Sequence, residues 1–287
     1  MWVDQGLNDR WVRPQPIKKA GPGRFTITLC EPLGRHWPRE IVAYPWRRSM
    51  EPRRVSHQGR DVPFQRIGAV LSILVEDLAP GEQRVYELDG RGGARAAAGG
   101  DHGIRLIRSG ARMVFTNGVI ALALPASQRF TRSTQAVIPG PLLAIRRGEG
   151  PWLGGGRLAF RFAVRSVHTR RTERGPLWST AEVVYTFEGG YTYRVCFLLR
   201  PNDAACEVRE TSTLPVRLWP APRPYREIGS LGKSFWRQSR EAIAKPCLRP
   251  SPTSYFIFDL RGGWSADRMV THSTGAWEIM DLPLGAE

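Results

Sequence analysis

The sequence predicts an all-β fold in which one antiparallel sheet packs against another. Three runs between residues 177 and 209 alternate apolar and polar side chains with a period of two, the pattern of strands that bury one face. Glu188-Gly189-Gly190 and Pro201-Asn202-Asp203 separate these runs, and such residues are typical of tight turns. Consecutive strands joined by tight turns form a meander, and its single apolar face needs a second layer of strands to cover it.

The composition indicates a globular protein that is long enough for two domains. Of its 287 residues, 41% are hydrophobic and 10% aromatic, which excludes a disordered chain. The 30 glycines and 23 prolines suit many short strands joined by tight turns. Both observations agree with the all-β prediction.

The formal net charge of +16 is carried almost entirely by arginine. Basic residues gathered on one face are typical of nucleic-acid binding, but these arginines are spread along the predicted strands, and no recognised nucleic-acid motif accompanies them. A guanidinium group also matches the geometry of a carboxylate on an acidic sugar. We therefore expect an acidic polysaccharide or oligosaccharide, rather than nucleic acid, as the partner.

The first β region is expected over residues 24–90. From Arg24 onward, Phe25, Ile27 and Leu29 alternate with threonines, as in a strand with one buried face. Similar but shorter patterns predict further strands at 41–44, 62–65, 70–75 and 84–88.

Three segments lack these patterns. Residues 1–23 are polar and show no period, so we interpret them as an extension. Residues 91–103 are rich in Gly, Ala and Arg without a large apolar side chain, which predicts a linker. Residues 216–253 are crowded with proline and arginine and predict an irregular segment, in which 235–244 is the one helical candidate; a strand is expected again at 255–258.

The second β region, residues 104–287, begins with a predicted hairpin. Strands at 113–116 and 119–124 are joined through Asn117-Gly118, a strong hairpin signal because both residue types accept positive φ. A further strand around 158–165 then leads into the meander.

The cysteines and histidines predict neither a metal site nor a cofactor. The four cysteines show no CxxC spacing, and no two of the five histidines have the HxxxH spacing of metal ligands. Cys196 and Cys206 flank one turn, so a disulfide between them depends on strand register and stays open. The N-terminal residues do not resemble a signal peptide, and the longest apolar run, 69–75, is too short to cross a bilayer, so we expect no membrane partner.

Several stretches resemble the exo-rhamnogalacturonan lyase-like bacterial proteins. In the first region, Gly59–Gln65, Val75–Glu82 and Val85–Leu88 are similar to the RIFT-type β-barrel that opens this family. In the second region the similarity to the family's central β-sandwich rests on Thr116–Gly118, Gly140–Leu142, Trp152 with its neighbouring glycines, Glu173–Leu177 and Tyr185–Phe187.

The resemblance covers residues 24–215 and implies a small RIFT-type β-barrel followed by an antiparallel, supersandwich-like β-sandwich. Full-length relatives continue into a large α/α toroid with which their lyase chemistry is associated. This sequence shows no run of amphipathic helices after the sandwich, so the resemblance carries over no catalytic residue. It implies a carbohydrate-active protein, the non-catalytic β portion of such a polysaccharide lyase, standing alone or truncated, with a separate toroid domain as a further candidate partner.

The candidate carbohydrate-binding residues are two tryptophans and two arginines. Trp152 lies in a glycine-rich stretch close to Arg146 and Arg147, where its ring could stack on a pyranose beside cationic groups. Trp178 occupies the face of its strand opposite the apolar set. Packing within a core or between domains is the alternative role for both rings.

Two other functions remain open at this stage. One is a stand-alone polysaccharide lyase or glycosidase with a site between barrel and sandwich, and the other is a basic nucleic-acid-binding module. The first predicts eliminase or hydrolase activity, and the second predicts a steep dependence of nucleic-acid binding on salt.

Overall fold

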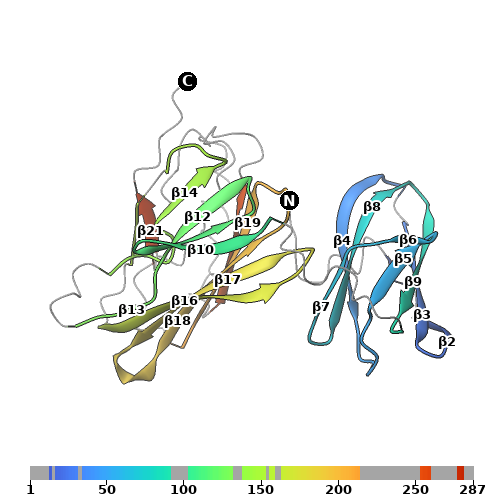
Figure 1. Ribbon diagram of the computed structural model, residues 1–287, viewed down its shortest axis with the longest axis horizontal. Coiled ribbons are helices and arrows are strands. Elements are labelled where there is room, and N and C mark those ends of the chain that lie inside the picture. Colours follow the sequence, from blue (N-terminus) through green and yellow to red (C-terminus); the bar gives the residue numbers. More distant parts are fainter. Residues whose placement is uncertain are drawn as a thin grey trace, which may run out of the picture. The chain divides into compact units, whose positions relative to one another are not determined.

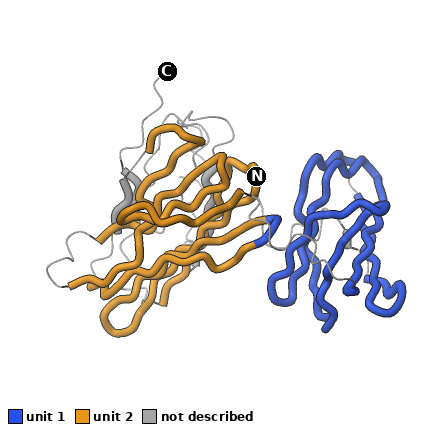
Figure 2. Tube along the Cα trace, viewed as in Figure 1, with its two compact units in different colours: residues 1–100, 175–177 blue, residues 101–174, 178–287 orange. Residues whose placement is uncertain are grey.

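A computed structural model describes residues 13–14, 17–31, 34–91, 103–131, 138–152, 155–158, 163–213, 253–259 and 277–280 (Figure 1). Within these ranges the long elements are all strands, and the helical structure is a single 3₁₀ turn at Glu188–Gly190. The all-β prediction is confirmed. The chain divides into two compact units, residues 1–100 with 175–177 and residues 101–174 with 178–287 (Figure 2).

The first unit is a small barrel made of two sheets that share one core. The chain passes from the first sheet into the second where β6 leads directly to β7. Large side chains such as Ile27, Tyr44 and Trp46 are almost fully buried between the sheets. The first sheet has the order β1-β3-β9-β5-β6, with β2 also paired to β3, and comprises β1 (Arg13–Pro14), β2 (Lys18–Gly21), β3 (Arg24–Cys30), β5 (Arg54–His57), β6 (Arg60–Asp61) and β9 (Gln83–Asp89). The second has the order β4-β8-β7 and comprises β4 (Trp37–Pro45), β7 (Phe64–Ile67) and β8 (Val70–Leu78).

Interpreting residues 1–23 as an extension is wrong for β1 and β2. Both strands pair with β3, with Lys19 opposite Phe25 and Pro14 opposite Leu29. The first three residues of β2 are exposed, so this edge strand has no apolar face. A search for alternating apolar residues cannot detect such a strand, because its pairing rests on backbone hydrogen bonds alone.

The second unit is a sandwich whose two main sheets cover one core. The four-stranded sheet has the order β10-β11-β12-β14 and comprises β10 (Arg105–Ser109), β11 (Arg112–Thr116), β12 (Ile120–Pro125) and β14 (Ala144–Arg147). The six-stranded sheet has the order β13-β16-β17-β18-β19-β20 and comprises β13 (Gln128–Arg129), β16 (Val164–Arg174), β17 (Ser179–Phe187), β18 (Thr192–Leu199), β19 (Ala205–Ser212) and β20 (Thr253–Asp259). A separate pair joins β15 (Gly155–Leu158) to β21 (Trp277–Met280). The predicted meander is therefore β17-β18-β19, and β20 contains the strand expected at 255–258; the helical candidate at 235–244 lies outside the described residues.

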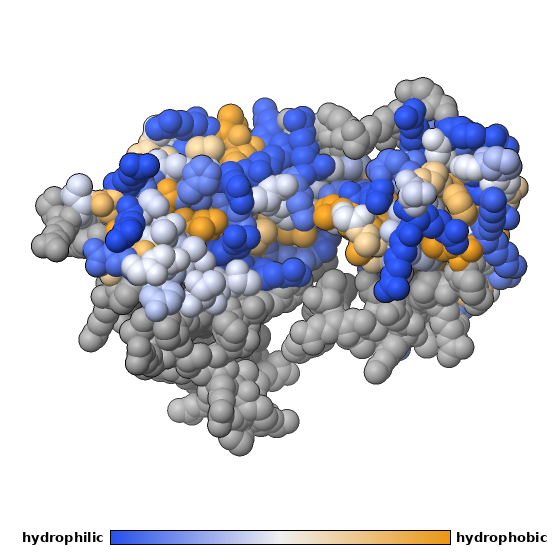
Figure 3. All heavy atoms as spheres, turned by 90° about the horizontal axis from the view of Figure 1, so that it is seen from below, coloured by the Kyte–Doolittle hydropathy of each residue, from blue (hydrophilic) through white to orange (hydrophobic). Residues whose placement is uncertain are grey.

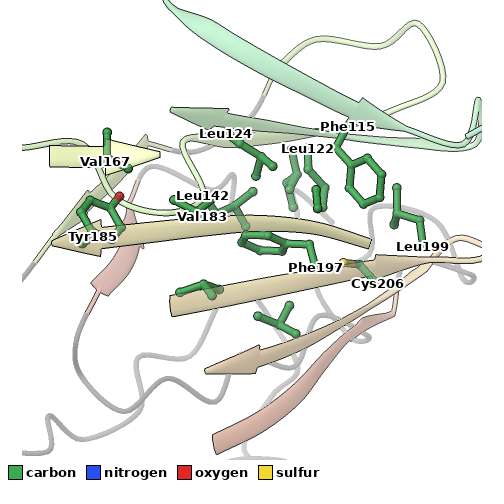
Figure 4. Close-up of a cluster of buried hydrophobic side chains, with 14 of the residues drawn as sticks. Phe115, Leu122, Leu124, Leu142, Val167, Val183, Tyr185, Phe197, Leu199 and Cys206 are labelled. Carbon is green, nitrogen blue, oxygen red and sulfur yellow. The ribbon is translucent and has the colours of Figure 1, made fainter. Parts of the chain in front are cut away.

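The alternating residues of the meander form one half of the sandwich core. Phe115 and Leu122 of the four-stranded sheet face Val183, Phe197 and the other inward residues of the six-stranded sheet (Figure 4). Every odd position from Leu177 to Phe187 is buried, as the alternation predicts. The period of two therefore assigns the apolar side chains to the core and leaves the even positions on the opposite face of the sheet.

Asn117 ties the β11–β12 hairpin to the turn between β18 and β19. Its side-chain amide donates hydrogen bonds to the carbonyl oxygens of Arg200, at 2.7 Å, and Asp203, at 2.6 Å. Its Oδ1 accepts from the backbone N–H groups of Val119, at 3.0 Å, and Ile120, at 2.9 Å. One buried side chain thus satisfies four backbone groups and connects the two sheets.

The hairpin itself is confirmed, but the conformation expected for Asn117 is wrong. Gly118 has a φ of 87°, whereas Asn117 is not among the non-glycine residues with positive φ in the described part of the chain. The pairing places Thr116 opposite Ala121, so the tight turn is centred on Gly118 and Val119. Asparagine is needed here for its side-chain hydrogen bonds rather than for its backbone conformation.

Replacing Asn117 with alanine is expected to destabilise the protein by about 3 kcal/mol, because buried polar groups left without partners cost about 1–3 kcal/mol each. Asn117→Asp should be at least as damaging, since a carboxylate cannot donate to the carbonyls of Arg200 and Asp203. Urea unfolding measures both effects. Gln128→Ala, at an exposed position of β13, is the control and should change stability by no more than about 0.5 kcal/mol. If Asn117→Ala were as stable as the wild type, the connecting role of the Asn117 side chain would be contradicted.

Candidate functional site

Arg146 and Trp152 form a cation–π pair beside the turn that follows β14. The guanidinium carbon of Arg146 lies 4.7 Å from the centroid of the Trp152 ring. The turn between them is closed by the Gly150 N–H, which donates to the Arg147 carbonyl at 2.9 Å, and Gly148 adopts a φ of 53° there. The chain therefore reverses direction in a sharp, glycine-containing turn, which brings Trp152 back into contact with Arg146.

The guanidinium of Arg146 is only weakly held by carboxylates. Its Nη1 lies 3.5 Å from Oε2 of Glu149, whose side chain is 94% exposed, and such solvent-screened pairs contribute little. Its buried Nε has no hydrogen-bond partner within the described residues. The Arg146 side chain is 25% exposed, so the pair presents a cation and an aromatic ring together at the surface. That combination suits a ligand with both an apolar face and a negative charge.

The other two predicted site residues, Arg147 and Trp178, do not join this pair. Arg147 is exposed and pairs in register with Ile120, whereas Arg146 pairs with Ala121, so the two arginines point to opposite faces of β14. Trp178 is half-buried directly before β17, and its Nε1 donates to Oε2 of Glu173 at 2.9 Å. Of the four candidates, the structure brings together Arg146 and Trp152 alone.

A second charged arrangement occupies the outward face of the six-stranded sheet. Strand pairing aligns Arg170, Glu182, Cys196 and Arg209 in one row across β16, β17, β18 and β19. The Glu182 side chain is 5% exposed although it lies on the polar face. A buried carboxylate requires compensating partners, and its neighbours on both sides supply them.

Two arginines, one from each flanking strand, hold Glu182. Nε and Nη2 of Arg170 both lie 3.0 Å from Oε2, and Nη1 of Arg194 lies 2.9 Å from Oε1. The guanidinium groups belong to side chains that are 55% and 49% exposed, respectively. We call Arg170, Glu182 and Arg194 the Glu182 cluster. Sequence reasoning missed it, although the alternation of charged residues on the even face of the meander contained the signal for Glu182 and Arg194.

Cys196 lies beside this cluster as a protonated thiol. Burial, followed by the charges of Glu182 and Glu173, raises the pKa of Cys196 to about 11. A thiol with so high a pKa is a poor nucleophile near neutral pH, because the thiolate is the reactive form. Cys196 therefore has no expected catalytic role in this face.

The described histidines do not form a metal site. Nδ1 of His57 lies 2.8 Å from the Val85 carbonyl oxygen, and Nδ1 of His168 lies 3.0 Å from Oγ of Ser127. His36 is 3.8 Å from Asp77 at the surface. Across the ranges that the structure describes, no group of three His, Cys, Asp or Glu residues could hold a metal ion.

The described surface is largely polar. Figure 3 shows hydrophilic residues over much of one face, interrupted by small hydrophobic patches. The exposed large hydrophobic residues of the described chain are Val70, Val85 and Ile107, on three different strands. The same residues contain no helix of the length and apolar character that a bilayer crossing requires. Such a surface favours a polar or charged ligand over an apolar one.

Comparison of the sequence with protein-family models and with curated proteins gives no match.

Cys196 and Cys206 do not form a disulfide. Both are free, and their register is offset, with Cys196 opposite Arg209 and Cys206 opposite Leu199. The offset of three residues amounts to about 10 Å along the strand, beyond the roughly 7 Å limit for the Cα atoms of a disulfide. Cys206 also faces the core, whereas Cys196 lies on the outward face.

The thiols of Cys196 and Cys206 should both react with iodoacetamide in denaturant without prior reduction. In the folded protein, Cys206 should be alkylated far more slowly than the half-exposed Cys30, because its side chain is fully buried. Peptide mass spectrometry measures the labelling of each site. Recovery of a peptide pair linked through Cys196 and Cys206 would contradict the strand register.

Proposed function

We propose that the protein binds acidic, pectic polysaccharide as the non-catalytic β portion of an exo-rhamnogalacturonan lyase-like polysaccharide lyase. The observation that carries the proposal is the surface pair of Arg146 and Trp152. The resemblance of residues 24–215 to the β domains of that family, and the all-β architecture, support it.

The pair offers two complementary contacts to a uronate-containing chain. The ring of Trp152 can pack against the apolar C–H face of a pyranose. The guanidinium of Arg146 can hydrogen-bond the carboxylate of the same or the next sugar, and hydrogen bonds to charged groups contribute about 1.5–3 kcal/mol. Because the arginine already lies over the ring, little ordering of side chains is needed when the ligand binds.

Trp152→Ala and Arg146→Ala are each expected to weaken binding of pectic oligosaccharides about tenfold, because each removes one of these two contacts. Isothermal titration calorimetry with oligogalacturonides measures the change. Arg147→Ala is the matched control: it removes the neighbouring arginine, which points to the opposite face of β14, and should leave the affinity unchanged. Unchanged affinity in Trp152→Ala and Arg146→Ala would remove this site from the proposal.

We also expect no eliminase activity. In the resembled family the lyase chemistry belongs to a toroid domain rather than to the β domains. Incubation with rhamnogalacturonan should therefore produce no rise in the ultraviolet absorbance of an unsaturated uronate product. A progressive rise that survives repeated purification would instead favour a lyase with its own active site.

A further inference from the structure

We infer that the Glu182 cluster is a second recognition site, which binds the carboxylates of a uronate chain laid across β16, β17 and β18. This inference rests on the proposed function, since it names a further surface for the same class of ligand. It is independent of the Arg146–Trp152 pair, which lies on the four-stranded sheet and the turn that follows it.

Glu182 orients its two arginines but leaves most of their donors unused. Each guanidinium has five N–H donors, and the contacts with Glu182 use two from Arg170 and one from Arg194. No other hydrogen bond or ion pair of these two side chains is present within the described residues, and about half of each side chain is exposed. Glu182 is thus a positioning residue that holds two half-exposed arginine side chains, each with donors left over for a ligand.

The charge of the cluster favours an anionic ligand. One carboxylate faces two guanidinium groups, so the cluster carries an excess of one positive charge. Arg209 lies exposed in the same row, two strands from Glu182, and adds to this positive field. The planar fork of arginine matches a carboxylate in a bidentate way that lysine cannot reproduce.

A polysaccharide fits this face better than nucleic acid does. Nucleic acid presents closely spaced phosphates, and proteins bind it through Lys and Arg clustered in a basic patch or stripe. Here Glu173, Glu182 and Glu207 alternate with the arginines on the same sheet, and Glu207 forms an ion pair with Arg200. Mixed charges of this kind repel a dense phosphate ladder but accept carboxylates that are separated by neutral sugar surface.

The deciding variant is Arg170→Lys combined with Arg194→Lys. It keeps the net charge and an ion pair to Glu182 but removes the planar forks, so the fold should be preserved. Calorimetry with an oligogalacturonide should show about tenfold weaker binding. The fully methyl-esterified oligomer, which lacks the carboxylates, should bind the variant and the wild type equally.

Two controls separate this inference from the proposed function. Arg105→Lys with Arg112→Lys changes two exposed arginines of the four-stranded sheet and should leave the affinity unchanged. Thermal unfolding checks that both double variants are folded. Wild-type affinity in Arg170→Lys/Arg194→Lys, together with a loss in Trp152→Ala, would overturn the second site and leave the proposed function standing.

Failure of the wild type to bind any oligogalacturonide would overturn the proposed function and this inference together. Tighter binding of duplex DNA than of an oligogalacturonide with equal charge, weakened in Arg170→Lys/Arg194→Lys, would assign the cluster to nucleic acid and overturn the choice of polysaccharide.

Discussion

The second unit depends on the apolar layer between its two sheets. The layer contains Phe115 and Leu122 from one sheet and Val183 and Phe197 from the other. Each of these side chains is at most 1% exposed. Because strand side chains alternate, filling this layer also determines which residues point outward. A register slip of one residue would exchange the core face and the outward face of a strand, so core packing specifies the position of every outward charge. The candidate sites are in this sense consequences of the core.

Glu182 shows how the outward face tolerates a buried charge. The guanidinium groups of Arg170 and Arg194 contact the carboxylate, and the two arginine side chains are themselves 55% and 49% exposed. One carboxylate oxygen accepts a charge-assisted hydrogen bond from Arg170 and the other forms an ion pair with Arg194, so the cost of removing Glu182 from water is offset locally. Thr180, the preceding outward residue of β17, is also buried, and its hydroxyl lies 2.7 Å from that of Thr172. The outward face is therefore an organised polar layer, unlike the freely solvated face that alternation alone suggests.

The sequence allowed the strands of the meander to be predicted, but not the contacts across them. Alternation gives the face of each residue, and it correctly assigned Val183 and Phe197 to the core. Register depends on turn length: Leu199 pairs with Cys206 and Cys196 pairs with Arg209, and these partners could not be deduced from the sequence. The pairing of Arg170 with Glu182 also depends on the irregularity between Arg171 and Glu173 in β16, for which the sequence carries no turn or glycine signal. Arg146 and Trp152 were predicted together because they are close in sequence, whereas the position of Arg147 required strand geometry.

The dominance of arginine over lysine has a structural explanation in several places. Arg171 donates to the Ile104 carbonyl and to the Ser179 hydroxyl, which lie 3.0 Å and 2.8 Å from its Nη2. Arg84 bridges Glu82 and the backbone of the β8–β9 corner, and its hydrogen bond to Glu82 is the main cause that lowers the pKa of that carboxyl. Such forked contacts need several donors in one plane, which a lysine ammonium does not provide. Part of the formal charge of +16 is therefore engaged in holding strands and turns together. The proposed recognition of an anionic ligand depends on the smaller share carried by arginines such as Arg170 and Arg194, whose side chains are about half exposed.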